Sequence, residues 1–220
     1  MPKVAPSAAL STISGRFAGI VVANTKSGLV IRREAKYKRA QSDAQRESVW
    51  RLKRAAEVWA GFDYVQAGAW DDYAQTVWRH NHLTGDAYHP SGYNAFSALA
   101  TKVLQINPAA EIPTAPPVGE YFGDVVTLSV QGLQMDILFT ASAPNSPSTT
   151  TELLLERLPN ERRKSTGRLV SAGFHQFHTV SLEVAVPVEA GWYVAGYRFV
   201  ELATGRQTQA QVIGRTEATT

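Results

Sequence analysis

Histidines are the residues of this sequence that could hold a transition metal, because it contains no cysteine. The span "RHNHLTGDAYH" places His80, His82 and His89 close to Asp86. Neutral imidazoles are good zinc ligands, and three of them could form a catalytic site with an open position. On a helix, however, residues two apart point to different faces, so His80 and His82 converge only where the helix has ended. We expect no metal and no cofactor, and a metal-dependent hydrolase stays as an alternative that elemental analysis can test.

The other reactive residue types lack the spacing that catalysis needs. His175 and His178 are three apart in an expected strand region, where such residues face opposite sides. Asp71 and Asp72 are adjacent on an expected helix, so their side chains diverge by about 100 degrees and cannot flank one scissile bond. The sequence has no Gly-x-Ser-x-Gly motif, no P-loop and no Gly-x-Gly-x-x-Gly motif. These observations predict a protein that is not an enzyme.

The strongest functional signal is positive charge near the N-terminus. Residues 1–62 contain 12 Lys and Arg against 4 Asp and Glu, although the net charge of the whole chain is only +3. Cations interleaved with aromatic residues suit either a protein interface or the phosphates and bases of a nucleic acid. A solvated helix face is the competing interpretation. We expect a partner-binding surface formed by Arg32, Arg33, Lys36, Lys38, Arg39, Arg46, Trp50 and Arg54.

The elements expected to position these charges are a β-hairpin and the first of three helices. Two β-rich runs, 17–23 and 29–33, flank a five-residue connection that ends in Gly28, which predicts a hairpin. Ser42 and Gln45 form a capping-box pattern, which predicts a helix that ends near Gly61. The helical spacing predicts that its buried face carries Val49, Leu52, Ala56 and Trp59.

Two further helices are expected to complete the N-terminal module. One runs from about Tyr64 to Leu83 and carries a repeating set of large side chains at Trp70, Tyr73, Val77 and Trp78. The other begins after Ser91, a good N-cap residue, in the span "SGYNAF". Its spacing places on the buried side Tyr93, Phe96, Ala100 and Val103.

The C-terminal half has a different periodicity. The span "NPAAEIPTAPPVGE" is rich in proline, and after it seven strand-length runs alternate with Gly, Pro, Asn and Ser. The pattern predicts a seven-stranded immunoglobulin-like or fibronectin type III-like β-sandwich. The expected fold class is therefore α+β, with a hairpin and helical module at 1–106, a linker at 107–119 and the sandwich at 120–220. No apolar run is long enough for a membrane span and no signal-peptide pattern opens the chain, so we expect neither membrane insertion nor export.

Several short motifs occur in a recognisable order: "ISGRFAGIVV", "SGLVIRR", "AQRESVWRLKRAAEVW", "AWDDYA" and "GYNAF". This succession resembles a family of small uncharacterised proteins encoded in the structural gene clusters of tailed phages and prophages, related members of which carry a C-terminal immunoglobulin-like domain. The sequence departs from the family where "KRAQSDAQ" replaces an Asn-Pro-x-Thr motif. The resemblance covers about residues 11–100 and is carried by Ser14, Gly15, Gly28, Arg32, Arg33, Gln45, Arg46, Trp59, Trp70, Gly92, Tyr93, Asn94 and Phe96.

The resemblance implies a non-enzymatic structural protein of the virion, which lies in the host cytoplasm before assembly. The expected role is that of a minor or decorating capsid protein whose basic N-terminal module binds the shell. Its expected partners are other virion proteins, first the major capsid protein, and a homo-oligomer stays open. The alternatives are a nucleic-acid-binding accessory protein of the particle and a head–tail or tail component.

Overall fold

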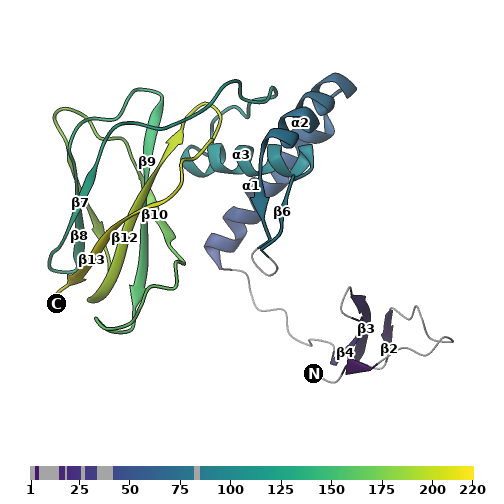
Figure 1. Cartoon of the computed structure of the whole chain (residues 1–220), viewed down its shortest axis with the longest axis horizontal. Coiled ribbons are helices and arrows are strands. Elements are labelled where there is room, and N and C mark those ends of the chain that lie inside the picture. Colours follow the sequence, from purple (N-terminus) through teal and green to yellow (C-terminus); the bar gives the residue numbers. More distant parts are fainter. Residues whose placement is uncertain (1–2, 5–14, 18, 26–27, 34–41, 82–84) are drawn as a thin grey trace. The chain divides into compact units, whose positions relative to one another are not determined.

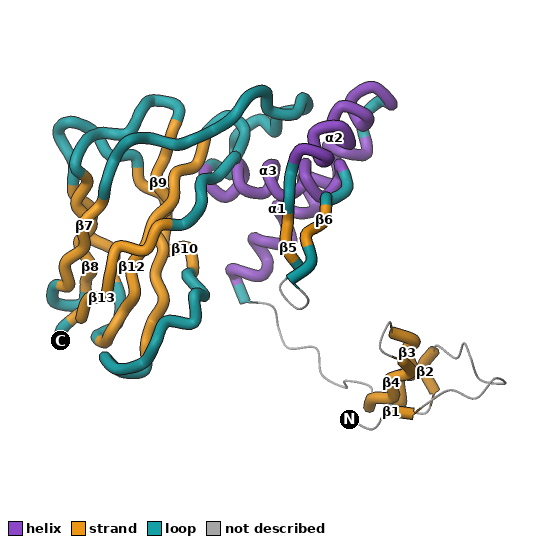
Figure 2. The backbone as a smooth tube through the Cα atoms, viewed as in Figure 1, coloured by secondary structure: helices purple, strands orange, loops and turns teal. Residues whose placement is uncertain are grey.

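The computed structural model describes residues 3–4, 15–17, 19–25, 28–33, 42–81 and 85–220 (Figure 1). The chain divides into two compact units, Met1–Gln45 and Arg46–Thr220. The described residues contain three helices and many antiparallel strands, so the predicted α+β class is confirmed (Figure 2). The predicted linker at 107–119 lies inside the second unit, together with the helices and the C-terminal strands.

The first unit is a small antiparallel sheet with the strand order β1-β4-β3-β2. Its strands are β1 (Lys3–Val4), β2 (Gly15–Phe17), β3 (Ile20–Thr25) and β4 (Gly28–Arg33). Pairing of β3 with β4 confirms the predicted hairpin, but the register brings Thr25 opposite Gly28. The connection is therefore two residues long and not five, because both β-rich runs continue further toward the turn than their apolar residues indicate.

Helix α1 (Asp43–Ala60) begins and ends as the sequence predicts. The Gln45 backbone N–H donates to Ser42 Oγ at 3.3 Å, and the Ser42 N–H donates to Gln45 Oε1 at 3.0 Å. This is a complete capping box. At the other end, the Gly61 N–H donates to the Val58 carbonyl at 3.0 Å, and the helix does not continue.

The predicted buried face of α1 is right for Trp59, which packs against the helical core, and wrong for Val49 and Leu52. Val49 and Leu52 are exposed over 50% and 49% of their surface, whereas Ala55, one turn after Leu52, is fully buried. The inward side consists of Ala55, Val58 and Trp59, all of which belong to the helical core. The side of α1 that meets the core is therefore centred on Ala55 and not on Leu52, and the larger apolar residues Val49 and Leu52 remain exposed.

Helix α2 (Tyr64–Thr76) is shorter than predicted. Asp63 and Gln66 form a capping box at its start, and at its end Val77 has the extended backbone angles φ −97° and ψ 122°. The His89 ring donates from Nδ1 to the Val77 carbonyl at 3.0 Å, which replaces the bond that a longer helix would supply. The following residues form two short paired strands, β5 (Arg79–His80) and β6 (Ala87–Tyr88).

Helix α3 (Gly92–Ile106) completes the helical core. Ser91 is its N-cap, as predicted, and Ser91 Oγ accepts from the Asn94 N–H at 3.3 Å. Asp71 from α2 also accepts from the Gly92 N–H at 2.9 Å. Tyr93 is 38% exposed and packs against the Trp59 ring in a T-shaped contact, so its predicted burial is wrong. The buried residues of this core are Ala55, Trp70, Phe96, Ala100, Leu104 and Ile112.

The proline-rich segment packs against the helices. Ile112 is buried in the helical core, and the Trp70 indole N–H donates to the Thr114 carbonyl at 2.9 Å. An indole N–H in a core needs such a partner, because an unpaired buried donor costs about 1–3 kcal/mol. The segment therefore provides part of the helical core as well as the connection to the strands.

Residues 120–220 contain seven strands in two antiparallel sheets, with the orders β10-β9-β12-β13 and β11-β8-β7. We call this part the two-sheet region. Its strands are β7 (Leu128–Gly132), β8 (Asp136–Ala141), β9 (Thr149–Leu158), β10 (Val170–His175), β11 (Glu183–Pro187), β12 (Gly191–Glu201) and β13 (Gln211–Ala218). Each predicted strand-length run corresponds to one of them.

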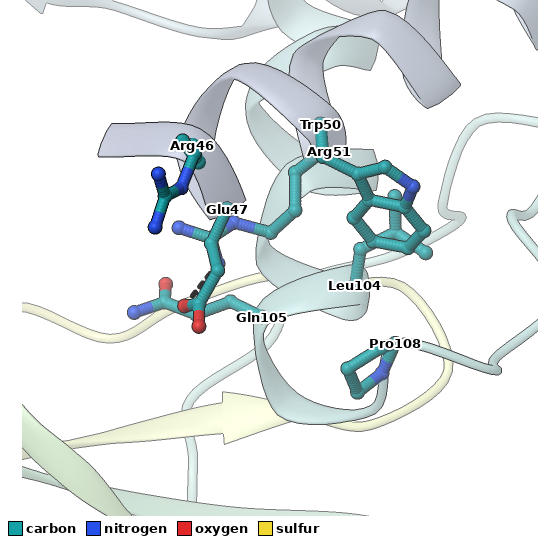
Figure 3. Close-up of a pocket in the computed structure, with 7 residues that line it drawn as sticks. All are labelled: Arg46, Glu47, Trp50, Arg51, Leu104, Gln105 and Pro108. Carbon is teal, nitrogen blue, oxygen red and sulfur yellow. Dashed lines mark ion pairs between the residues drawn. The ribbon is translucent and has the colours of Figure 1, made fainter. Parts of the chain in front are cut away.

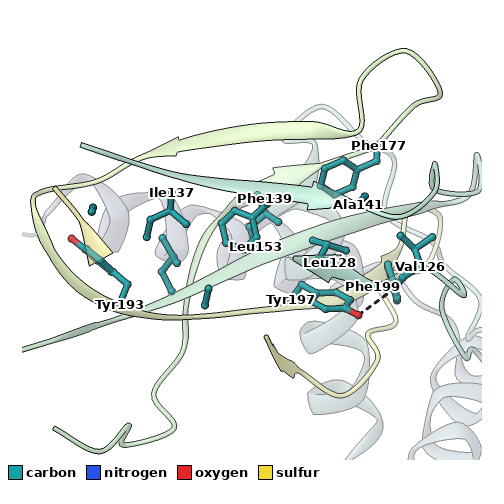
Figure 4. Close-up of a cluster of buried hydrophobic side chains, with 13 residues drawn as sticks. Val126, Leu128, Ile137, Phe139, Ala141, Leu153, Phe177, Tyr193, Tyr197 and Phe199 are labelled. Carbon is teal, nitrogen blue, oxygen red and sulfur yellow. Dashed lines mark hydrogen bonds between the residues drawn. The ribbon is translucent and has the colours of Figure 1, made fainter. Parts of the chain in front are cut away.

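Both sheets contribute side chains to one core (Figure 4). Ile137 and Phe139 come from β8, and Leu153 and Leu155 come from β9. Successive strand residues point to opposite sides, so Glu152, Leu154 and Glu156 face away from this core. They are nevertheless buried, which shows that the outer face of β9 is covered.

Helix α3 covers part of that outer region. Gly205, in the turn after β12, has φ +76°, and a Cβ at this position would lie 2.4 Å from the Leu99 carbonyl oxygen of α3. Only glycine combines that conformation with so close an approach. Lys102 of α3 also reaches Glu152 of β9. The second unit thus joins its helices to its strands directly.

Candidate partner-binding surface

Two of the predicted partner-binding residues, Arg46 and Trp50, lie in one groove between α1 and the C-terminal end of α3. The groove has a volume of about 460 Å³ (Figure 3). Arg46, Glu47, Trp50 and Arg51 line it from the N-terminal half of α1. Leu104, Gln105 and Pro108 line it from the opposite side. The Trp50 indole points toward the apolar side chains of Leu104 and Pro108 in this view.

Charged groups lie at one end of the groove. Arg51 forms an ion pair with Glu47, with 3.8 Å between Nη1 and Oε2. Arg46 lies one turn before Trp50 on the same helix, since residues four apart share a face. An apolar floor beside guanidinium groups suits a partner segment that combines an apolar side chain with a carboxylate.

Large apolar side chains continue from the groove along the outside of α1. Val49, Trp50 and Leu52 are exposed over 50%, 45% and 49% of their surface. Lys53 and Arg54 lie among them and share the carboxylate of Glu57, at 3.9 and 3.5 Å. Such exposed ion pairs contribute little to stability. We call this set of residues, together with Arg46, the α1 surface.

The far wall of the groove is held by an ion network that connects α3 to the strands. The Lys102 ammonium donates to Gln105 Oε1 at 2.8 Å and to both carboxylate oxygens of Glu152 at 3.0 and 3.1 Å. Arg198 Nε of β12 donates to Glu152 Oε2 at 2.6 Å. The Lys102 ammonium also lies 5.3 Å from the centre of the Phe174 ring. Gln105 is therefore fixed at the groove by a chain of buried contacts.

Burial and charge compete in this network. Burial alone would raise the pKa of the Glu152 carboxyl, but the hydrogen bond from Arg198 and the charge of Lys102 outweigh it and lower that pKa below its usual value. Burial lowers the pKa of the Lys102 ammonium, and the nearby carboxylate of Glu152 opposes the change. The Glu152 side chain is fully buried, so its negative charge depends on these two cations.

The other predicted partner-binding residues are placed differently. Arg32 and Arg33 are exposed on β4 in the first unit, and Arg54 is on the α1 surface outside the groove. Lys36, Lys38 and Arg39 lie outside the described residues. The groove therefore brings together Arg46 and Trp50 from the predicted set, and adds Arg51 and the end of α3.

The histidines have separate surroundings. His80 is exposed on β5, His89 is bonded to the Val77 carbonyl and stacks on Trp78, and His82 lies outside the described residues. Burial lowers the pKa of His175, whose ring packs against Phe177, and His178 is exposed. In the part of the chain that the structure describes, no three His, Asp or Glu residues gather closely enough to hold a metal ion.

The residues that hold the groove wall were not predicted from the sequence. Lys102 stood within an apolar helical pattern, and Glu152 within the apolar run "TTTELLLERL". A charged residue in the middle of a buried run is the signal that could have identified them, since such residues are seldom buried without a partner.

Comparisons with known proteins add little to this description. No family model and no curated protein matches the chain. Two solved structures resemble part of it. One is a family 76 glycoside hydrolase from a bovine Bacteroides thetaiotaomicron strain, with 10% identity, a TM-score of 0.33, and coverage of 42% of this chain and 20% of that one. The other is the PmoD soluble domain from Methylocystis sp. ATCC 49242 (Rockwell), with 14% identity, a TM-score of 0.26, and coverage of 47% and 97%.

Proposed function

We propose that this chain is a non-enzymatic structural protein of a tailed-phage particle, a minor or decorating capsid protein that binds the shell through its basic N-terminal half. The phage assignment rests on the sequence resemblance over residues 11–100. The binding role is supported by one structural observation, namely that Val49, Trp50 and Leu52 are exposed among cations on a single helix. Interfaces are enriched in aromatic and Arg side chains. Burial of exposed apolar groups of this size by a partner makes the free energy of binding more favourable.

The major capsid protein is the proposed partner on the shell. An acidic segment with an apolar side chain fits the groove, because Arg46 and Arg51 can receive a carboxylate while Trp50, Leu104 and Pro108 receive the apolar group. The proposed location is the virion, and the host cytoplasm before assembly. Within the described residues, none of the helices has the length and apolar content needed to cross a bilayer.

We also propose that the two-sheet region is an immunoglobulin-like or fibronectin type III-like domain. If the strands β7 to β13 are numbered 1 to 7, the two sheets have the strand orders 4-3-6-7 and 5-2-1. One sheet thus has four strands and the other has three, as in that class of domain. The Tyr193 hydroxyl at the start of the sixth strand, β12, donates to the Glu189 carbonyl at 2.8 Å. A tyrosine in this position that bonds to the preceding backbone is a feature of such domains.

Sedimentation of intact particles tests the proposed function. We expect a tagged chain, expressed in the host during phage growth, to sediment with intact particles and with empty capsids that contain no DNA. A chain that stays in the soluble fraction would contradict the proposal. A chain that sediments with filled particles only, and binds free DNA through Arg32 and Arg33, would instead favour the nucleic-acid-binding accessory protein.

A further inference from the structure

A second basic surface lies at the far end of β9, in the loop 159–168 that connects it to β10. The loop reads "PNERRKSTGR" and all of its residues are exposed. It borders a hollow of about 400 Å³ that is lined by several cations, by the last residues of β9, and by Pro159 and Val170. The cations on this hollow are Arg157, Arg163, Lys164 and Arg168.

Most of these cations have no side-chain partner among the residues that the structure describes. Arg157 is paired with Glu189 across the strand end. Within residues 85–220, which the structure describes without a gap, no side-chain hydrogen bond or ion pair is made by Arg162, Arg163, Lys164 or Arg168. Arg215 of β13 donates to the backbone carbonyl of Glu161 at 2.9 Å and adds a further positive charge beside the loop.

The Glu156 carboxylate fixes the conformation of the loop without forming an ion pair with its cations. Glu156 accepts hydrogen bonds from the Ser165 hydroxyl, from the Thr166 hydroxyl at 2.7 Å and from the Thr166 N–H at 2.8 Å. These bonds, the one from Ser165 first, lower the pKa of Glu156 to about 2. The acceptor sites of this carboxylate are thus occupied by neutral donors, and the unpaired cations of the loop are left to the solvent.

The composition of the loop distinguishes it from the α1 surface. Residues 159–168 contain four Lys and Arg, one Glu and no large apolar side chain. The apolar lining of the neighbouring hollow comes from Leu155 and Leu158, which are already buried, and from Pro159 and Val170. A protein interface is centred on large apolar side chains, whereas phosphate binding is carried by cations. We propose that the loop 159–168 binds the phosphate backbone of a nucleic acid, with Arg162, Arg163, Lys164 and Arg168 as the contacting side chains.

Binding of the full chain to a 30-base-pair DNA duplex at several salt concentrations tests this site. Four phosphate contacts predict that the logarithm of the association constant falls with the logarithm of salt concentration with a slope of about −3 to −4. Replacing Arg162, Arg163 and Lys164 by Ala is expected to weaken binding at least about tenfold at 0.1 M salt and to reduce the slope to about −1. The unfolding midpoint should not change, because the three side chains are exposed and unpaired.

A control variant that removes the same number of cations elsewhere distinguishes loss of contacts in the loop from a general effect of lower positive charge on DNA binding. Replacement of Arg46, Lys53 and Arg54 by Ala on α1 also removes three cations, and is expected to weaken DNA binding by less than about threefold. Equal loss in both triple variants would overturn the proposal, as would no loss in the loop variant. Arg162→Lys with Arg163→Lys should bind within about threefold of the unmodified chain, and a loss as large as that of the Ala variant would overturn a site based on charge.

A competitor distinguishes a nucleic acid from an acidic protein surface. Poly-L-glutamate carries regularly spaced carboxylates in place of phosphates, and we expect it to displace the duplex at least about tenfold less well at equal charge concentration. Equal competition would assign the loop to acidic protein partners and would overturn the proposal of a nucleic acid.

Discussion

Glu152 and Glu156 lie four residues apart on the outer side of β9. Glu152 helps to position the groove beside α1, and Glu156 positions the loop 159–168. Glu152 accepts from cations, Lys102 and Arg198, and through Lys102 it fixes Gln105 at the groove beside α1. Glu156 accepts from two hydroxyls and one backbone N–H in the loop 159–168. The two carboxylates occupy equivalent positions in one strand and differ in the charge of their donors.

This difference determines which charges remain available. At Glu152 the two cations form ion pairs within the protein and are not available to a partner. Binding at the groove would therefore depend on the apolar side chains of α1 and on Arg46 and Arg51. At Glu156 the donors are neutral, so the neighbouring cations stay free for a partner. A carboxylate that is paired with cations stabilises the contact between two elements, whereas a carboxylate bonded to hydroxyls can shape a loop without forming an ion pair with the cations of that loop.

The largest effect is expected from Glu152→Ala. The substitution leaves Lys102 and Arg198 without their shared carboxylate in a buried site, which typically costs about 3–5 kcal/mol of the free energy of unfolding. Urea denaturation followed by tryptophan fluorescence measures this loss. Binding of DNA by the loop 159–168 should be unchanged under conditions where the variant is folded.

Glu189→Ala is the matched control for this prediction. Glu189 also pairs with an arginine, Arg157, but both side chains are more than half exposed. Loss of an exposed pair typically costs less than about 1 kcal/mol. Equal losses in the two variants would show that the network around Glu152 does not stabilise the contact between α3 and β9.

A second prediction concerns Trp50. A half-exposed tryptophan at the centre of an interface commonly contributes about 2 kcal/mol or more to binding. Trp50→Ala should therefore weaken binding to empty capsids about 30-fold, while the free energy of unfolding changes by less than about 1 kcal/mol. Isothermal titration or quantitative sedimentation measures the affinity.

Trp78→Ala provides the comparison for Trp50. Trp78 is 63% exposed and stacks on His89 away from the groove. Its replacement should leave capsid binding unchanged. If the two variants lose affinity equally, or if neither loses any, Trp50 is not a contact residue and the groove is not the binding site.

The sequence predicted the fold better than it predicted the faces of the elements. Caps and strand runs depend on local residues, so Ser42, Ser91 and the seven C-terminal strands could be identified from their neighbours in the chain. The spacing of Val49, Leu52 and Ala56 predicts a helix. It does not predict which side of that helix meets the core. The side that meets the core is centred on Ala55, and it is set by the residues of α2, α3 and the segment around Ile112 that share this core.

The parts of the candidate site that escaped prediction are long-range pairs. Lys102 and Glu152 are fifty positions apart in the sequence, and Arg198 comes from a third element. Each is an ordinary charged residue in its own segment, and only the packing of α3 against β9 and β12 brings them together. Trp50 and Arg46 were predicted because they belong to a basic cluster that contains aromatic residues, whereas Leu104 and Pro108, which complete the groove, were not predicted.

The smallest effect is expected from titration of Glu156. Its folded-state pKa of about 2 lies below its usual value of 4.5, so its contribution to stability is fully present above pH 4.5 and is lost as the pH falls toward 2. The Thr166 amide resonance should therefore stay constant from pH 7 to about 4 and then shift with a midpoint near 2. Glu156→Gln should abolish this shift, and Glu161→Gln should leave it unchanged. A midpoint near 4.5 would mean that Ser165 and Thr166 do not bond to the carboxylate in solution, and the cations of the loop would then be free to pair with Glu156 in place of phosphate.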